Sequence, residues 1–167
     1  MGLSEDLEKI ATQERELHLP RLDAQVAWDL GTRIRSMAVE RGLILVIDVR
    51  RFGQPLFYAA FDGTTPDNAE WVRRKSNVVA RFHRSSYAVG MTLKVKGTTL
   101  AERYGLPVAD YAADGGSFPL FSENAGIVGS VTVSGLPQRD DHNLVVEALC
   151  ALLIKDFAAL RLGPETA

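Results

Sequence analysis

The sequence predicts one α+β domain in which helices flank an antiparallel sheet. Three features predict this class: two amphipathic segments before residue 42, two closely spaced apolar runs within residues 43–61, and a long helical pattern from residue 65. Strands that arrive in hairpins, with long helices between them, are typical of α+β folds. The 167 residues have the length of one domain and allow a full hydrophobic core.

Two helices are expected before the first strand. Residues 3–17 place apolar side chains at helical spacing, and Pro20 ends that segment. Residues 22–41 repeat the pattern, and Gly42 ends it. We expect residues 1–20 to form an N-terminal helical extension, residues 21–162 the α+β domain and residues 163–167 a tail, since termini detach most easily from a core.

The next segment predicts a hairpin. Residues 43–49 are a continuous apolar run rich in β-branched side chains, as expected of a strand covered on both faces. A turn at residues 51–55 separates them from a second strand at residues 56–61, so the two strands pair antiparallel. Asp48 lies inside the first strand and needs a charged partner, which an arginine of the following helix or Lys75 could supply.

Residues 65–90 contain the longest helical pattern. Thr65 suits the N-cap and Pro66 the first helical position. At about 100° per residue, the apolar side chains share one arc and most arginines lie on the adjacent arc. Lys75 breaks this division, because it lies in the middle of the apolar arc. Its amine either extends past its neighbours, pairs with a buried carboxylate or faces a cavity that needs a cation.

The remaining elements are shorter. Residues 90–97 are compatible with either a helical extension or a short strand, and residues 98–105 predict a helix. Short and long strands are expected at residues 120–121 and 125–135, followed by a final helix from about residue 140. Gly129 lies inside the long strand, where a glycine indicates that another backbone or a ligand comes close.

The loop Asp114-Gly115-Gly116-Ser117 is a second candidate for function. Paired glycines allow backbone N–H groups to turn toward an anion, whereas a plain tight turn is the alternative. The loop lacks the glycine spacing of the common phosphate-binding and dinucleotide-binding motifs.

Composition excludes several classes of function. A net charge of −2 argues against bulk attachment to nucleic acid. No apolar run is long enough for a membrane span, and residues 1–10 have no secretory pattern, so we expect a cytoplasmic protein. The single Cys150 falls in an apolar helical stripe and is expected to be a buried structural thiol.

The sequence does not indicate a structural metal site. The three histidines lack the i, i+4 spacing of a helical site, and one cysteine cannot form a thiolate cluster. His83 is a weak candidate for a single axial haem ligand, with a solvated side chain as the alternative. Ser85 and Ser86 are not part of a nucleophile elbow, so acyl transfer is not indicated.

Three blocks resemble the haem-degrading-domain superfamily of GlcG-like and haem-binding-protein-like chains. They are W-V-R-R-K-x-N-x-V-x-R-F-x-x-S-S at residues 71–86, G-G-x-F-P at residues 115–119 and G-x-V-G-x-V-x-V-S-G at residues 126–135. The resemblance covers residues 22–160 and is strongest to a branch of uncharacterised stand-alone bacterial and fungal proteins.

The resemblance implies a profilin-like or PAS-like five-stranded antiparallel sheet and assembly into a homo-oligomer. Some relatives bind haem, some are associated with its degradation or with redox sensing, and others are accessory domains of corrinoid adenosyltransferases. A fungal relative is linked to delivery of tail-anchored membrane proteins. Members of the branch often carry histidine at the position of Asp114, and aspartate ligates haem iron poorly, which leaves a hard-cation or small-anion site as the alternative.

The first hypothesis is therefore a protein that binds a small anionic ligand, either haem or an organic acid, in a homo-oligomer. Cationic side chains would hold carboxylates, and Trp71, Phe82 and Phe118 would supply apolar walls. A structural or interaction protein that acts through its oligomeric surface is the second hypothesis, in which residues 73–84 form intersubunit salt bridges. A metal-dependent enzyme on a small organic acid is the third. The predicted ligand-binding residues are Arg74, Lys75, Arg81, Ser85, Asp114, Gly115, Gly116, Phe118 and Gly129.

Overall fold

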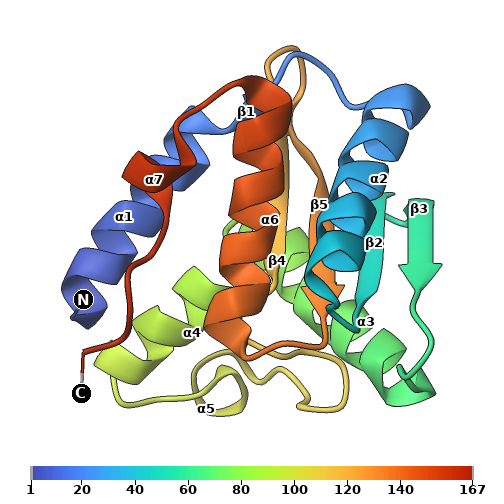
Figure 1. The fold of residues 1–167 in the computed structure, drawn as a ribbon. Coiled ribbons are helices and arrows are strands. Elements are labelled where there is room, and N and C mark those ends of the chain that lie inside the picture. The colour runs from blue at the N-terminus through green and yellow to red at the C-terminus, as the bar shows by residue number, and fades with distance from the viewer. Residues whose placement is uncertain (1, 167) are drawn as a thin grey trace.

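The computed structural model describes residues 2–166 and shows a five-stranded sheet between two layers of helices (Figure 1). Neighbouring strands pair antiparallel, except that the two-residue strand β1 joins β4 in parallel. The predicted α+β class and the five-stranded sheet flanked by helices are confirmed. Met1 and Ala167, the ends of the predicted extension and tail, lie outside the described residues. In spatial order the strands are β1 (His18–Leu19), β4 (Ser117–Ser122), β5 (Gly126–Ser134), β2 (Val46–Arg51) and β3 (Gln54–Ala60).

Helices cover both faces of the sheet. The helices α2 (Ala24–Arg41) and α6 (Gln138–Leu153) pack on one face, and α3 (Pro66–Phe82) packs on the other. The helix α1 (Leu3–Glu16) lies beside α4 (Ser86–Val95) and the short helix α7 (Phe157–Leu160), so the two ends of the chain meet (Figure 1). The helix α5 (Leu100–Tyr104) belongs to the connection between α4 and β4.

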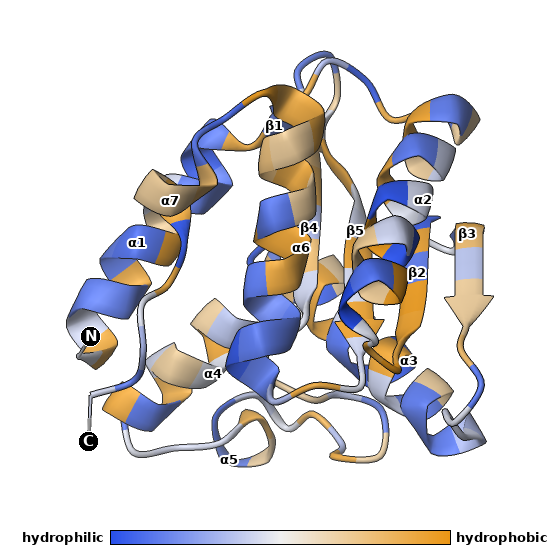
Figure 2. Ribbon diagram, in the orientation of Figure 1, coloured by the Kyte–Doolittle hydropathy of each residue, from blue (hydrophilic) through white to orange (hydrophobic). Residues whose placement is uncertain are grey.

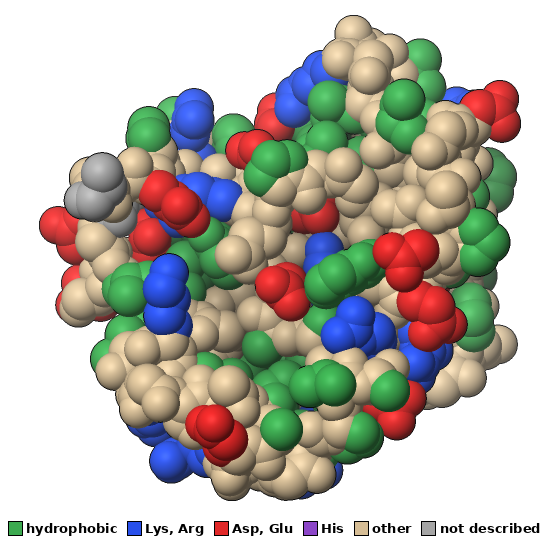
Figure 3. Space-filling view, turned by 90° about the horizontal axis from the view of Figure 1, so that it is seen from below, with side chains coloured by type: hydrophobic (Ala, Val, Ile, Leu, Met, Phe, Trp, Pro, Cys, Tyr) green, Lys and Arg blue, Asp and Glu red, His purple; other side chains and the backbone are tan. Residues whose placement is uncertain are grey.

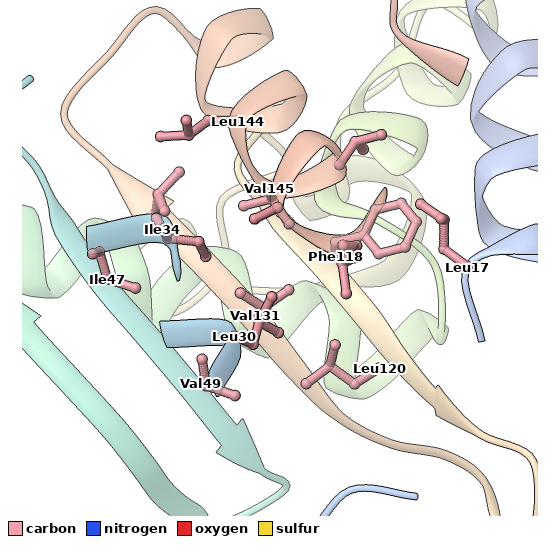
Figure 4. Close-up of a cluster of buried hydrophobic side chains, with 14 of the residues drawn as sticks. Leu17, Leu30, Ile34, Ile47, Val49, Phe118, Leu120, Val131, Leu144 and Val145 are labelled. Carbon is pink, nitrogen blue, oxygen red and sulfur yellow. The ribbon is translucent and has the colours of Figure 1, made fainter. Parts of the chain in front are cut away.

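The main core lies between the sheet and the α2/α6 layer. Leu30 and Ile34 of α2 meet Val131 of β5, and Phe118 points toward Leu17 and Val145 (Figure 4). Hydrophobic colour concentrates on β2 and β5, whereas α1 is largely hydrophilic (Figure 2). The side chains of β2 and β5 that point to this face thus form the core that joins α2 and α6 to the sheet.

The long helix predicted for residues 65–90 is two helices. His83 ends α3 with φ +53°, and the Ser85 hydroxyl then accepts a hydrogen bond from the Ala88 N–H at 3.1 Å to begin α4. The segment 90–97, which could have been a strand, is mostly helical as part of α4. Serine is a preferred N-cap, so a new helix can begin within three residues of the break.

The predicted hairpin is confirmed as β2 and β3, whereas the expected partner of Asp48 is wrong. Arg50, two residues further along β2, donates to both carboxylate oxygens of Asp48 at 2.7 and 2.8 Å. Side chains at i and i+2 share one face of a strand, so β2 pairs this buried charge within itself. The sequence analysis also did not predict β1 or α7.

Polar contacts attach α1 to the rest of the chain. Asp6 accepts two hydrogen bonds of 2.8 Å from the Arg139 guanidinium, and the Gln13 Oε1 lies 2.8 Å from His142 Nε2. All four side chains are buried. Buried charges are tolerated where they are paired, so α1 docks through specific contacts in addition to the apolar packing of Ile10.

Candidate functional site

A buried ion pair between Lys75 and Asp141 lies at the end of β5. Lys75 comes from the middle of α3 and is 4% exposed, and Asp141 comes from the first turn of α6. The Lys75 Nζ lies 3.0 Å from Asp141 Oδ2 and 3.4 Å from the Val133 carbonyl oxygen. Because α3 and α6 cover opposite faces of the sheet, this pair joins the two helical layers past the end of β5.

Burial dominates the protonation of Asp141. Loss of solvent raises the pKa of this carboxyl to about 6, although the nearby Lys75 ammonium and the N–H groups of Leu136 and Gly135 act in the opposite direction. The Leu136 N–H donates to Oδ1 at 3.0 Å. Asp141 is therefore a fixed carboxyl group that exchanges its proton close to neutral pH.

The glycine loop lies directly behind the ion pair. Gly116 has φ +134°, and a Cβ atom there would lie 2.6 Å from the Val133 carbonyl oxygen and 2.8 Å from Lys75 Nζ. The Gly115 N–H donates to the Gln138 Oε1 at 3.0 Å. The close approach of the loop to Lys75 explains why glycine is needed at residue 116.

The ion pair opens on a hollow of about 290 Å³. A second hollow of about 410 Å³ lies beside it and shares Asp114 and Gln138 as lining residues. Seen from below, this face of the molecule is hollowed and carries acidic and basic side chains beside hydrophobic ones (Figure 3). The first hollow is lined by Asn68, Trp71, Lys75, Asp114, Ser134, Gly135, Leu136, Gln138 and Asp141.

The structure brings together part of the predicted site. Lys75 and Asp114 line the hollow, with Gly115 and Gly116 behind them. Arg74 lies beside the hollow because its guanidinium stacks 4.7 Å from the Trp71 ring centroid and donates to the Val108 carbonyl oxygen at 3.0 Å.

Four predicted binding residues lie elsewhere. Arg81 is exposed on α3, Ser85 caps α4, and Phe118 is 1% exposed in the main core. Gly129 lies inside the first half of β5, away from the ion pair, and a Cβ atom there would lie 2.0 Å from the Arg50 carbonyl oxygen. The glycine in this strand therefore admits a neighbouring backbone, one of the two alternatives expected from the sequence.

The sequence analysis did not identify Asp141 and Gln138 as site residues. An aspartate in the first turn of a helix is usually explained by the helix dipole, and nothing in the local pattern pairs it with Lys75. The useful signal was the lysine itself, since pairing with a buried carboxylate is one of the ways in which a lysine on an apolar arc is accommodated.

The histidines do not form a metal site with other side chains. Among residues 2–166, no three His, Cys, Asp or Glu side chains are grouped so as to hold a metal ion. His83 is exposed and stacks on Phe52 with ring centroids 5.7 Å apart. His142 is buried, and loss of solvent together with the Arg139 charge lowers its pKa to about 3. Its Nδ1 has no hydrogen-bond partner among the described residues.

The fold and the hollow define an α+β domain with a charged site at one end of its sheet. The chain belongs to the HbpS-like family of haem-degrading proteins, whose model matches residues 22–150. A UPF0303 protein of Paraburkholderia phymatum is 57% identical over 163 residues, which cover 98% of this chain and 99% of that protein. The family resemblance expected from the three sequence blocks is confirmed.

Solved structures agree with this assignment. The crystal structure of the Ybr137w protein has a TM-score of 0.81 at 31% identity and covers 87% of this chain and 86% of its own. A structure described as a PduOC:haem complex has a TM-score of 0.67 at 14% identity, covering 78% of this chain and 94% of its own, and shows likeness of fold alone. Within residues 2–166, none of the helices has both the length and the apolar character that crossing a membrane requires.

Proposed function

We propose that the protein binds a small organic anion in the first hollow, with Lys75 as the group that holds the ligand's carboxylate. The observation that carries this proposal is the Lys75–Asp141 pair, buried on the protein side and open on the hollow. A lysine fixed in place loses little entropy when it binds an anion, and a partly desolvated charge interacts more strongly than one in water.

The charges around Lys75 determine how an anion binds. Asp141 already neutralises the ammonium, and Asp114 adds a second carboxylate to the lining. A ligand carboxylate therefore takes the place of Asp141 as the counter-ion of Lys75, while Asp141 accepts a proton. The raised pKa of Asp141, about 6, makes this exchange accessible at mildly acidic to neutral pH.

Trp71 supplies the apolar part of the site. Its ring lines the hollow and is half-buried, with Arg74 stacked on it. A flat or apolar ligand body would lie against this ring while its carboxylate reaches Lys75, and the Asn68 and Gln138 amides would bind further polar atoms.

Haem is one candidate ligand, supported by the family description and by the haem named in the PduOC structure. A haem propionate would enter the first hollow, and the macrocycle would extend across the shared lining of Asp114 and Gln138 toward the second hollow. The described lining of the first hollow contains no histidine, cysteine or methionine, so this proposal assigns the propionate and not the iron to this site.

Tryptophan fluorescence tests the proposal directly. The chain has two tryptophans, so Trp28→Phe leaves Trp71 as the single reporter. Titration of this variant with lactate, succinate or haemin is expected to change the Trp71 emission with saturation, and haemin is expected to give a shifted Soret band. The response should disappear when Lys75→Met and Asp141→Leu are combined, which removes both charges together.

The matched control is Lys96→Met, which removes an exposed lysine outside the hollow. If none of the three ligands changes Trp71 emission in protein that is folded by circular dichroism, the hollow is not an anion site. A response to the carboxylates without any Soret shift would restrict the ligand to organic acids.

The uncharged edge strand β3 favours a second role, self-association of the chain. β3 ends the sheet, contains no charged residue and carries Tyr58 at 50% exposure. Trp28, 58% exposed on α2, lies beside it through an edge contact with Phe57. Edge strands without charges are templates for pairing with another chain. We therefore propose a homo-oligomer in which two copies pair at β3.

Two of the arginines expected to form intersubunit salt bridges, Arg73 and Arg84, have acidic partners within the chain. Arg73 contacts Glu70 and Asp110 at 2.9 and 3.0 Å, and Arg84 contacts Glu14 at 3.3 Å. These contacts favour β3 over the arginine face of α3 as the surface for self-association.

A further inference from the structure

We infer that Lys75 forms an imine with a small aldehyde or ketone that enters the first hollow, and that Asp141 transfers the protons of this reaction. The inference rests on the proposed binding function, because the same hollow must admit the carbonyl compound. It adds a covalent step to that function.

Lys75 differs from the other lysines of the chain. Among residues 2–166 it is the only buried lysine, whereas Lys94, Lys96 and Lys155 are exposed and Lys9 is half-buried with its amine on the Ala159 carbonyl oxygen. Burial is one of the settings in which a lysine serves as an imine-forming amine, and here Asp141 is in contact as a proton acceptor. The 3.0 Å distance from Nζ to Asp141 Oδ2 allows the proton to pass directly between the two groups.

The surroundings leave room for a reacting carbon beside Nζ. Glycine at residue 116 keeps side-chain atoms away from the amine, since a Cβ there would lie 2.8 Å from Nζ. The hollow of about 290 Å³ extends outward from the amine between Trp71, Asn68 and Gln138. The Leu136 N–H holds the other oxygen of Asp141, so the carboxyl group keeps its orientation while its proton moves.

The steps balance in atoms and charge. After Lys75 gives a proton to Asp141, the Nζ electron pair forms a bond to the carbonyl carbon, and a proton from nitrogen moves to the carbonyl oxygen to give a carbinolamine. Asp141 then protonates the hydroxyl group, the C–O bond breaks and water leaves, while the nitrogen electron pair forms the C=N bond. The product is a protonated imine beside an Asp141 carboxylate, so a paired charge replaces a paired charge and no buried ion is left alone.

Asp141 is suited to this role by its environment. Burial raises its pKa to about 6, so its carboxylate binds a proton more readily than an exposed aspartate does and can release it again near neutral pH. The groups that face the pair are the Val133 carbonyl oxygen, the Leu136 N–H and, from the glycine loop, the Asp114 carboxylate at the hollow.

Reductive trapping tests the inference. The intact protein is incubated with pyruvate and sodium cyanoborohydride, which reduces the imine to a stable amine, and the adduct is located by peptide mass mapping. Lactate, which has the same carboxylate and no carbonyl, is the matched control. We expect the adduct to form faster at Lys75 than at Lys94 or Lys96, and not to form with lactate.

Two variants separate the roles of the pair. Lys75→Arg keeps the ion pair and must abolish the adduct at residue 75 without changing the slow reaction of Lys96. Asp141→Asn keeps the hydrogen bond from Leu136 and is expected to slow trapping at Lys75 by about 100-fold, the usual contribution of a positioned acid or base.

Each remaining outcome decides the matter. If the wild-type protein is trapped at Lys75 no faster than at its exposed lysines, the inference is overturned, and no variant is needed to show it. An unchanged rate in folded Asp141→Asn protein removes Asp141 from the reaction. If lactate and pyruvate both change Trp71 fluorescence and no adduct forms, the binding function stands and the imine does not; if neither ligand is bound or trapped, both proposals fail.

Discussion

At the scale of single residues, two adjacent side chains on α6, Asp141 and His142, make the stability of the fold depend on pH in opposite directions. Asp141 has its pKa raised by burial to about 6, and His142 has its pKa lowered by burial to about 3. In both cases burial disfavours the charged form of the side chain, although one side chain is an acid and the other a base. The two effects act in overlapping pH ranges and partly cancel in the wild-type protein.

The stability of the Asp141→Asn variant relative to wild type is expected to increase as the pH rises. The unfolded Asp141 releases its proton near pH 4 and the folded one near pH 6, so wild-type stability from this group is complete below pH 4 and falls as pH rises through 6. The free energy of unfolding of Asp141→Asn, relative to wild type, should rise over this window by on the order of 1–3 kcal/mol. Urea unfolding at pH 4, 5, 6 and 7 measures it, and a flat difference would contradict the assignment.

His142→Gln is expected to reduce acid sensitivity. An unfolded histidine takes up a proton near pH 6.5, whereas folded His142 does so only near pH 3, so the stability from this group is present above pH 6.5 and is lost as pH falls toward 3. Glutamine removes this loss, so the variant should lose less stability than wild type between pH 6.5 and 4. The exposed His83→Asn is the control and should follow wild type, because asparagine tolerates the positive φ there.

At the scale of secondary-structure elements, the end of α6 carries removable strain. Ile154 has φ +55° and is 94% exposed, so a β-branched side chain occupies the left-handed region with almost no packing in return. Ile154→Gly should raise the free energy of unfolding by about 1 kcal/mol, as measured by urea denaturation. Gly42→Ala, at the corresponding end of α2 with φ +64°, should lower it by a similar amount. A loss of stability in Ile154→Gly would show that the Ile154 side chain makes a stabilising contact.

Elements were predictable where local chemistry determines them. The hairpin follows from two apolar runs joined by a short turn, and the place of Lys75 on the apolar arc of its helix marked it as unusual, with a buried ion pair among the alternatives. The break at His83 was missed because the helical period continues across residues 81–89 and no glycine or proline marks the end of α3. The Asp48–Arg50 pair was missed because the strand was expected to end at residue 49, whereas β2 continues to Arg51.

The candidate site was only partly predictable for a different reason. Lys75, Asp114 and the paired glycines stand out in the sequence, but Asp141 lies 66 residues from Lys75 and reaches it only because α3 and α6 cover opposite faces of one sheet. Arg81 shares the helix of Lys75 and yet faces solvent. Residue type identifies candidates, whereas the register of each helix on the sheet decides which of them meet.

At the scale of the whole molecule, β3 is an edge strand without charged residues. Its outer edge is unpaired within residues 2–166, and the side chains of Trp28 and Tyr58 flank it on the two faces of the sheet. α1, by contrast, is fixed by buried polar pairs to α6 and offers no free apolar face comparable to this edge. The proposed oligomer therefore depends on β3.

Tyr58→Lys is expected to shift the proposed oligomer toward monomer, because a lysine on an edge strand opposes pairing with a second copy while its long side chain remains solvated. Tyr58 is 50% exposed, so a lysine there can extend its amine into solvent and the fold should persist. Light scattering after size-exclusion chromatography measures the change, with Val95→Lys on the exposed end of α4 as the control. Equal masses for Tyr58→Lys and wild type above the monomer value would move the interface away from β3, and a monomeric wild type would remove the oligomer. Because the hollow at Lys75 is lined by α3, α6 and the glycine loop of one chain, ligand binding and imine trapping should survive in the Tyr58→Lys monomer.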